Sequence, residues 1–309
     1  MYPVYLIVSH QSQSQYNNAH YDYVQELKFN ILNGKKEGFN LLYCSNDESE
    51  ERKMAIVNIV MVKEQRLVSK EMGIDRTYTI FKIKNGSKHE NADICDDSTC
   101  CQAWVSKEKR FERWEEQKRE SNWLKIEKAV NETAGKIVTY NGKPINAFFH
   151  ANSGGTTELP VNVWGGAGLP YLQVVETAGE EGYTQYSSEV ILNKEELIEK
   201  LKTKYSDIQI DFNNTDDIKI LDYTDGSRVK TVKFGNHELS GVETRTILGL
   251  KSTNFEITKE NDNIKFSVKG YGHGVGMSQW GAEGMAKEGF LCYDILKHYY
   301  TGVDIKDLY

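Results

Sequence analysis

The feature that most constrains the fold is a glycine-rich segment near the C-terminus, Lys269-Gly270-Tyr271-Gly272-His273-Gly274-Val275-Gly276-Met277-Ser278-Gln279-Trp280-Gly281-Ala282. Its glycines alternate with polar and aromatic residues, and glycine allows positive φ angles and a close approach of the backbone to a ligand. The segment lies between a predicted strand over residues 264–268 and a predicted helix. We interpret it as one wall of a binding site, with an ordinary strand-to-helix turn as the alternative.

A second polar loop follows a predicted β-hairpin. Residues 136–140 and 144–149 have strand character and are joined by Asn141-Gly142, a two-residue turn signal. The loop begins at His150 and continues as Ala151-Asn152-Ser153-Gly154-Gly155-Thr156-Thr157-Glu158. Short hydroxyl and carboxylate side chains with exposed amides suit sugar recognition. The hypothesis is a second wall of the same site; the alternative is a surface loop whose hydroxyls bond their own backbone.

Helix and strand signals alternate along the chain, with strands in the majority. Helices are predicted over residues 107–133, 194–204, 282–288 and 293–300, and a short helix is predicted after Ser240. Ser121 is a candidate N-cap within the first of these segments. Asn193 with Glu196, and Ser240 with Glu243, form capping boxes at the starts of the helix over 194–204 and the helix after Ser240. Strands are predicted over residues 26–32, 55–62, 218–223, 228–234, 255–257 and 264–268. The pattern predicts an α+β fold, with residues 1–309 as one strand-rich domain that has several short helices and a substrate cleft.

Charge and hydropathy narrow the classes of partner. The formal net charge of -7 and the pI near 5.6 provide no basic surface for nucleic acid. The longest apolar run near the start, Val4 to Val8, is too short for a membrane span or a signal-peptide core. We therefore expect no nucleic-acid partner and no transmembrane segment in this chain.

Three of the five cysteines lie close together in the sequence. His89, Cys95, Cys100 and Cys101 place one imidazole and three thiols in a short loop, and zinc prefers four such ligands in a tetrahedron. A structural zinc site is the prediction; a disulfide between Cys95 and Cys101 is the alternative. The other two cysteines, Cys44 and Cys292, are expected to be buried small hydrophobes.

Residues 76–305 resemble the stage II sporulation protein D family, which contains the lytic transglycosylases of endospore formers and related amidase enhancers. The second loop matches the family motif His-x-x-Ser-Gly-Gly-x-Thr-Glu, Val163-Trp164-Gly165 and Pro170-Tyr171-Leu172 continue the match, and the glycine-rich segment matches the C-terminal signature. Residues 1–75 match poorly. The substrate-binding residues implied by this resemblance are Arg76, His150, Ser153, Gly154, Gly155, Thr157, Glu158, His273, Ser278 and Gln279.

The resemblance also implies an activity, a cofactor and a location. Family members cleave the MurNAc-GlcNAc linkage of peptidoglycan glycan strands and form 1,6-anhydro products during endospore engulfment. They act between the mother-cell and forespore membranes, with a cell-wall amidase of the stage II sporulation protein P type as partner, and an anchoring helix is expected before the catalytic domain. Some clostridial members bind structural zinc, and His89, Cys95 and Cys101 match its ligands, while Cys100 replaces a histidine.

Glu71 is the candidate catalytic acid. Val68-Ser69-Lys70-Glu71-Met72 resembles the family sequence around its single acid, which protonates the leaving oxygen and then deprotonates the attacking 6-hydroxyl. In the family a helix leads from this acid into an Arg-Thr-Tyr motif, and here only residues 73–75 separate Met72 from Arg76, so we expect that helix to be missing. A solvated Glu71 is the alternative, with Glu64 a weaker candidate acid. Arg76 is a candidate for orienting the acid or the substrate.

Two other functions remain open from the sequence. A non-catalytic glycan-binding module or amidase activator fits the altered region around Glu71. A zinc hydrolase that uses His89, His150 or His273 is the other alternative, although four protein ligands around a zinc ion leave no position for a catalytic water.

Overall fold

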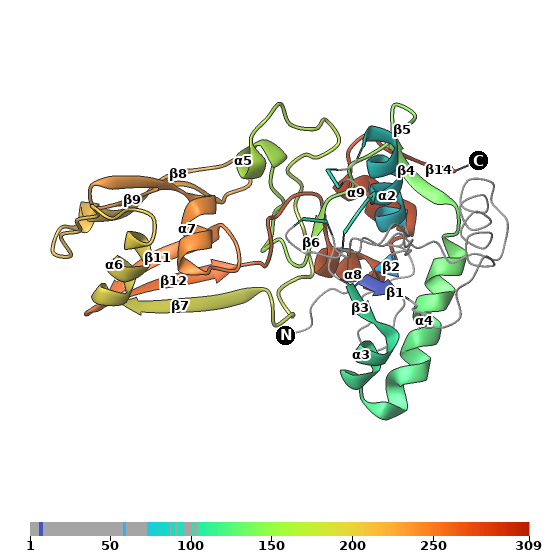
Figure 1. Ribbon diagram of the computed structural model, residues 1–309, viewed down its shortest axis with the longest axis horizontal. Coiled ribbons are helices and arrows are strands. Elements are labelled where there is room, and N and C mark those ends of the chain that lie inside the picture. The colour runs from blue at the N-terminus through green and yellow to red at the C-terminus, as the bar shows by residue number, and fades with distance from the viewer. Residues whose placement is uncertain are drawn as a thin grey trace. The chain divides into compact units, whose positions relative to one another are not determined.

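The computed structural model describes residues 6–8, 58–59, 73–86, 88–89, 92–95, 100–101 and 104–308. Contacts divide the chain into a C-terminal unit, Phe148–Phe290 with Ile295–Thr301, and an N-terminal unit, which comprises Tyr2–Ala147, Leu291–Asp294 and Gly302–Tyr309. Both contain helices and strands, so the α+β prediction is confirmed (Figure 1). The single domain predicted over residues 1–309 stays a prediction.

The N-terminal unit contains two small sheets and three α-helices among its described residues. Its elements are β1 (Leu6–Val8), β2 (Asn58–Ile59), α2 (Gly73–Asn85), β3 (Trp104–Ser106), α3 (Lys107–Glu112), the 3₁₀ turn Glu116–Lys118, α4 (Arg119–Glu132), β4 (Lys136–Tyr140), β5 (Lys143–Pro144) and β14 (Asp304–Asp307). The strand orders are β2-β1-β3 and β14-β4-β5. Asn141 and Gly142 both adopt positive φ angles and join β4 to β5, which confirms the predicted hairpin turn.

Helix α2 qualifies one expectation from the sequence. A helix does run through the Arg76-Thr77-Tyr78 motif, because α2 begins at Gly73, but only residues 73–75 of this helix precede Arg76. Asp75 in the first turn is favourable near the positive end of the helix dipole. The hydroxyl oxygen of Thr77 accepts a hydrogen bond from the backbone N–H of Val138 at 2.9 Å, which attaches α2 to strand β4. Tertiary packing of this kind stabilises a helix whose β-branched residues have low helix propensity.

The C-terminal unit holds the remaining elements. These are β6 (Phe149–His150), α5 (Pro160–Trp164), β7 (Ser187–Asn193), α6 (Lys194–Lys202), the 3₁₀ turn Thr215–Asp217, β8 (Ile218–Tyr223), β9 (Val229–Phe234), β10 (His237–Ser240), α7 (Gly241–Leu248), β11 (Asn254–Glu260), β12 (Asn263–Lys269), β13 (Met277–Ser278) and α8 (Gln279–Lys287); α9 (Cys292–Tyr299) contributes residues to both units. Two antiparallel sheets have the orders β10-β9-β8 and β11-β12-β7, and β13 pairs with β6 in parallel.

One hydrophobic core joins the two antiparallel sheets with helices α6 and α7. Figure 1 shows the ribbons of these elements grouped together. Strand β12 alternates buried and exposed residues, as a half-buried strand does. Its Phe266 packs edge-to-face on Phe255 of β11 with ring centroids 6.1 Å apart. Leu197 and Leu201 of α6 enter the same core with no exposed surface. This core supports the end of β12, from which the glycine-rich segment departs.

The predicted helix starts are confirmed at two positions and wrong at a third. Asn193 with Glu196 and Ser240 with Glu243 form the expected capping boxes. Ser121, however, does not cap a helix, because α4 begins at Arg119 and the Ser121 hydroxyl donates to the Lys118 carbonyl from within the first turn. The predicted helix over residues 194–204 ends at Lys202.

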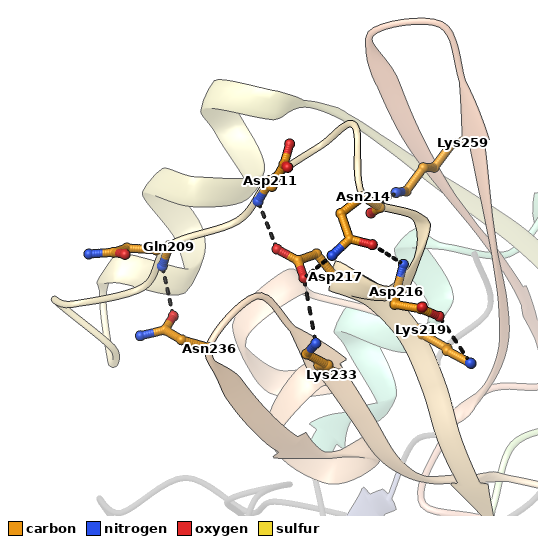
Figure 2. A network of polar contacts seen from close by, with 9 residues as sticks. All are labelled: Gln209, Asp211, Asn214, Asp216, Asp217, Lys219, Lys233, Asn236 and Lys259. Atoms are coloured by element: carbon orange, nitrogen blue, oxygen red, sulfur yellow. Dashed lines mark hydrogen bonds and ion pairs between the residues drawn. The ribbon is translucent and has the colours of Figure 1, made fainter.

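A polar network holds the loop between α6 and β8 (Figure 2). Asp217 accepts a hydrogen bond from the Asp211 backbone N–H at 2.8 Å and another from the Asn214 side-chain amide at 3.0 Å. Lys233 of β9 lies 3.5 Å from the Asp217 carboxylate. The Asp211 hydrogen bond, followed by the Lys233 charge, lowers the pKa of Asp217, so the carboxylate stays ionised and keeps the loop against the hairpin.

Several sequence predictions fall outside the described residues: the strand over residues 26–32, Cys44, Glu64 and the catalytic candidate Glu71. Of the strand predicted over residues 55–62, the structure describes β2. Cys292 is partly exposed, so its predicted burial is wrong. Within the described part of the chain, no helix is both long and apolar enough to cross a lipid bilayer.

Candidate functional site

The two loops singled out in the sequence lie side by side in the C-terminal unit. We call residues 150–158 the Ser153 loop and residues 270–278 the His273 loop. The parallel β6-β13 pair joins them at one end, with Ser278 opposite His150. Isolated β-bridges between Asn152 and Tyr271 and between Glu158 and Val275 join them further along. The structure thus brings together two motifs that are more than a hundred residues apart in the sequence.

Glycine is required where the two loops approach each other. Gly272 has a φ angle of +118°, and a Cβ atom there would lie 2.8 Å from the Cβ of His150. Gly274 has a φ angle of +83°, and its Cβ atom would lie 2.6 Å from the guanidinium carbon of Arg228. Any other residue would be strained and would push these side chains away. These two glycines therefore allow the His273 loop to pack closely against His150 and Arg228.

A buried glutamate that the sequence analysis missed links both loops. Glu180 has no exposed surface and accepts hydrogen bonds from the Ser153 backbone N–H at 3.0 Å, the Ser153 hydroxyl at 2.6 Å and the Thr177 hydroxyl at 2.8 Å. The Ser278 hydroxyl, from the end of the His273 loop, donates to the same carboxylate. Glu180 stands beside Glu181 in a polar stretch, and no motif spacing distinguishes the two.

We expect the Glu180→Ala substitution to lower the free energy of unfolding of the C-terminal unit by about 2–4 kcal/mol, because several buried donors lose their acceptor. Denaturant unfolding monitored by circular dichroism measures this change. Glu181→Ala is the matched control, since Glu181 is exposed and its removal is expected to change stability by less than about 0.5 kcal/mol. Equal stability of the two variants would contradict the proposed role of the network.

A buried arginine makes a second link to the Ser153 loop. The Arg228 guanidinium donates to the Ser153 carbonyl at 2.6 Å and to the Thr156 carbonyl at 3.2 Å. Burial lowers the pKa of Arg228 to about 10, and the nearby Glu158 carboxylate opposes this shift. Arg228 is therefore a cation at neutral pH. Glu158 in turn accepts hydrogen bonds from the Leu159 backbone at 2.7 Å and the Asn162 side chain at 2.8 Å.

His150 and His273 face each other with ring centroids 5.7 Å apart. Nδ1 of His150 donates to the Val275 carbonyl at 3.2 Å, and Nδ1 of His273 accepts from the Val275 backbone N–H at 3.0 Å. Burial, followed by the Arg228 charge, lowers the pKa of His150 to about 3. Burial, followed by the repulsion that two protonated imidazole rings would exert on each other and by the Arg245 charge, holds the pKa of His273 well below its usual value. Both rings are therefore neutral near pH 7.

The shifted pKa of His150 makes the stability of the C-terminal unit depend on pH. Between about pH 6.5 and pH 3 the unfolded chain binds a proton that the folded chain does not, so stability is lost as pH falls. The expected slope from this residue is about 1.4 kcal/mol per pH unit. Urea unfolding at pH 7, 6 and 5 measures the slope, which should be smaller by that amount in His150→Gln. Equal slopes in wild type and variant would disprove the assignment.

Most of the residues predicted to contact substrate are buried. Thr157 donates to the Gln173 carbonyl at 3.0 Å and accepts from the Val175 N–H at 2.8 Å. Ser153, Glu158, Ser278 and Gln279 also have at most 1% of their surface exposed. Their hydrogen bonds, as far as the structure describes them, are made within the protein, and the Gln279 amide has no hydrogen-bond partner there. Their contact with substrate stays a prediction, whereas the hydrogen bonds by which Ser153, Thr157, Glu158 and Ser278 hold the loops are visible.

Aromatic residues border the His273 loop. The Trp164 ring lies 4.7 Å from that of Phe148 and 5.0 Å from that of His273, measured between centroids. Trp164 keeps 51% of its surface exposed. Trp164 belongs to the segment that carries the family resemblance but is not among the site residues predicted from the sequence. An aromatic residue next to a polar sugar-type loop is the signal that could have identified it.

Arg76 lies in the N-terminal unit and bonds to backbone there. Its Nη1 donates to the Thr133 carbonyl at 2.6 Å and the Lys136 carbonyl at 2.9 Å. These contacts attach α2 to the end of α4 and the start of β4. Its predicted contact with substrate stays a prediction, as does the role of Glu71, which lies outside the described residues.

The four predicted metal ligands come together in the N-terminal unit. Their ligand atoms all lie within 4.8 Å of one another. Nε2 of His89 is 3.4 Å from the sulfur atoms of both Cys100 and Cys101, which are 3.7 Å from each other. Tetrahedral zinc with ordinary bond lengths places two sulfur ligands about 3.8 Å apart and a nitrogen and a sulfur ligand about 3.6 Å apart. The donor set and its spacing therefore fit a metal ion.

Two neighbouring side chains complete this cluster. The Tyr78 hydroxyl of α2 hydrogen-bonds Cys101, and burial together with the thiol charges raises the pKa of Tyr78. Lys88 bonds Cys100, which raises the pKa of Lys88. Burial acts to raise the pKa of Cys100, but hydrogen bonds from Cys95 and Lys88 bring it below its usual value. A positive side chain and a donor beside the thiols are the outer contacts that a thiolate metal site uses.

Comparison with known proteins assigns the family. A family model described as Stage II sporulation protein matches residues 74–140, from α2 to the end of β4. Stage II sporulation protein D of Bacillus subtilis is 35% identical over 234 residues, which are 75% of this chain and 66% of that relative. The chain belongs to the stage II sporulation protein D family. The Bacillus amyloliquefaciens protein of the same name aligns with the same identity and coverage, so the chain spans about two thirds of the length of these relatives.

The amidase enhancer of Bacillus subtilis is a more distant relative. It is 30% identical over 229 residues, which are 58% of this chain and 32% of that protein. The relatives of this chain therefore include proteins that are named for sporulation and a protein that is named for its effect on an amidase.

Proposed function

We propose that this chain is a peptidoglycan lytic transglycosylase that acts on the MurNAc-GlcNAc linkage of glycan strands during endospore engulfment. The observation that supports this most is the pair of loops from the family signature, which Glu180 and Arg228 hold in one arrangement. Recognition of a sugar strand requires a backbone fixed in place and an aromatic ring that stays exposed, and Trp164 beside these loops is 51% exposed. The family relationship to proteins of sporulation gives the proposed context.

In the proposed reaction Glu71 is the only catalytic carboxyl group. Its protonated form donates to the glycosidic oxygen while the bond between that oxygen and the anomeric carbon breaks. The 6-hydroxyl of the same muramic acid ring attacks the anomeric carbon and gives its proton to the Glu71 carboxylate. The acid is regenerated, one new chain end and one 1,6-anhydro end form, and no water is consumed.

Incubation with denuded glycan strands, followed by mass analysis of the fragments, tests this function. Transglycosylation gives fragments that end in an anhydro sugar, and these are lighter by one water than the products of hydrolysis. Fragments with ordinary reducing ends would overturn the transglycosylase proposal in favour of a hydrolase. If the protein binds the strands but leaves them intact, the result would support the second candidate.

That second candidate is a glycan-binding module that activates a cell-wall amidase. The relationship to the amidase enhancer favours it. An assay with a purified cell-wall amidase of the stage II sporulation protein P type distinguishes the two, since an activator increases release of stem peptides without any anhydro product. Either function would be carried out on cell-wall glycan in the space between the mother-cell and forespore membranes.

We also propose that His89, Cys95, Cys100 and Cys101 bind structural zinc. Four nitrogen and sulfur ligands at tetrahedral spacing support this metal and leave no coordination position for water. The ion would hold together a segment of the chain that offers one buried apolar side chain among its described residues, Ile94.

A further inference from the structure

We propose that Trp164 is an aromatic platform on which one N-acetylated sugar ring of the glycan strand stacks. This inference rests on the proposed glycan substrate and adds the residue that recognises the apolar face of a ring. A pyranose has an apolar face of C–H groups and a polar edge of hydroxyls. The backbone amides of residues 166–168 provide polar groups, and Trp164 provides a flat apolar surface beside them.

The Trp164 side chain is unusually exposed. Trp164 is 51% exposed, although indole is the largest apolar side chain and folding normally covers it. It is the last residue of α5, whose first residue is Pro160, and the backbone N–H of Gly165 bonds back to the Val161 carbonyl at 3.0 Å. The helix therefore ends at the tryptophan and presents its ring beside a turn.

The Trp164 ring is held in place before any ligand binds. Phe148 and His273 contact it with interplanar angles of 36° and 57°. Glu158 binds the Asn162 side chain and so fixes α5 to the Ser153 loop. The His273 ring is itself held by the Val275 N–H. A ring supported in this way loses little conformational freedom on binding, which favours a functional surface over accidental exposure.

A glycine-rich turn with unbonded backbone amides borders the Trp164 ring. The residues that follow are Gly165-Gly166-Ala167-Gly168, and Ala167 is the only one of them with a side-chain carbon. A Cβ atom added at Gly165, Gly166 or Gly168 would meet nothing within 4 Å, so the space beside this turn is open. Within the described part of the chain, the backbone N–H groups of Gly166, Ala167 and Gly168 make no hydrogen bond. Hydroxyl or acetamido groups of a sugar can accept from such amides while the ring covers the indole.

The size of the apolar surface favours a sugar over a protein partner. On α5 the exposed large apolar side chains are Val161, at 40%, and Trp164. A specific protein interface buries about 800 Å² on each partner, far more than these two side chains offer. One indole face matches one pyranose ring.

Binding of tetra-N-acetylchitotetraose and of denuded glycan strands tests the platform. Isothermal titration should show binding by the wild type, roughly tenfold or more weaker binding by Trp164→Ala, and an intermediate affinity for Trp164→Phe, which keeps a ring against Phe148. Tyr223→Ala is the matched control, since Tyr223 is a 52% exposed aromatic residue of the same unit and its removal should leave affinity unchanged. Thermal unfolding of each variant shows whether the fold is retained.

The outcomes separate this inference from the proposed function. Unchanged affinity in a folded Trp164→Ala would overturn the platform even if the wild type releases anhydro products. Binding that depends on Trp164, in a protein that releases no such products, would support the platform and contradict the transglycosylase. Absence of wild-type binding to both probes would overturn the platform.

Discussion

Glu71→Gln is expected to reduce the release of anhydro-ended fragments by about 10²–10⁴-fold, the usual contribution of a general acid. Glutamine has nearly the shape of glutamic acid but cannot give up a proton to the glycosidic oxygen. Affinity for denuded glycan strands should stay within about twofold, because the Trp164 surface and the two loops are unchanged. Mass analysis of fragments measures the loss, and a sedimentation assay with insoluble glycan measures the binding.

Glu64→Gln is the matched control for this prediction. It removes the same charge from the same polar part of the chain, and we expect it to keep full activity. Loss of activity in Glu64→Gln with full activity in Glu71→Gln would transfer the catalytic role to Glu64. Full activity in both variants would eliminate a single-acid mechanism that uses either residue.

Removal of metal is expected to have the second large effect. A zinc ion held by four ligands contributes most of its binding free energy, about 10–16 kcal/mol in small zinc domains, to the fold that presents them. Chelation should therefore lower the thermal midpoint by about 10 °C or more and expose three thiols to a thiol reagent. Elemental analysis of the purified protein should find one zinc per chain.

Variants of the cysteines test which side chains bind the ion. Cys95→Ser should lose zinc, whereas Cys100→His should keep it, because imidazole is as competent a zinc ligand as a thiolate. Cys292→Ser is the control, since Cys292 is not a member of the cluster. Retention of one zinc by Cys95→Ser would remove that residue from the ligand set. Protein isolated without metal, with the same thermal midpoint before and after chelation, would contradict the structural role.

Local signals in the sequence predicted many of the elements correctly. The capping boxes at Asn193 and Ser240 and the turn at Asn141-Gly142 depend on contacts between residues only a few positions apart. They can therefore be predicted without knowledge of the rest of the chain. The strand over residues 264–268 was likewise predicted by alternation, and the structure extends it to β12. The metal cluster was found for a similar reason, because its four side chains lie within thirteen residues.

Features that depend on tertiary contacts were missed. Helix α2 contains β-branched residues, which have low helix propensity, and its packing against β4 stabilises the helical conformation. Glu180 differs from Glu181 in the sequence by nothing except position, and its role follows from the donors that fold around it. Trp164 became a candidate when its exposure and its contact with His273 were known.

The shared carboxylate of Glu180 has a consequence for how affinity can be tuned. Because Ser153 and Ser278 bind the same side chain, neither loop can shift without disturbing the other. If the proposed glycan strand binds beside these loops, it meets a shape that is already set, so little conformational entropy is lost on contact and a few weak interactions per sugar ring suffice. Selection for a different glycan chemistry would then have to act at the rim, at positions such as Trp164 and the glycines after it, while the interior of the two loops stays as it is.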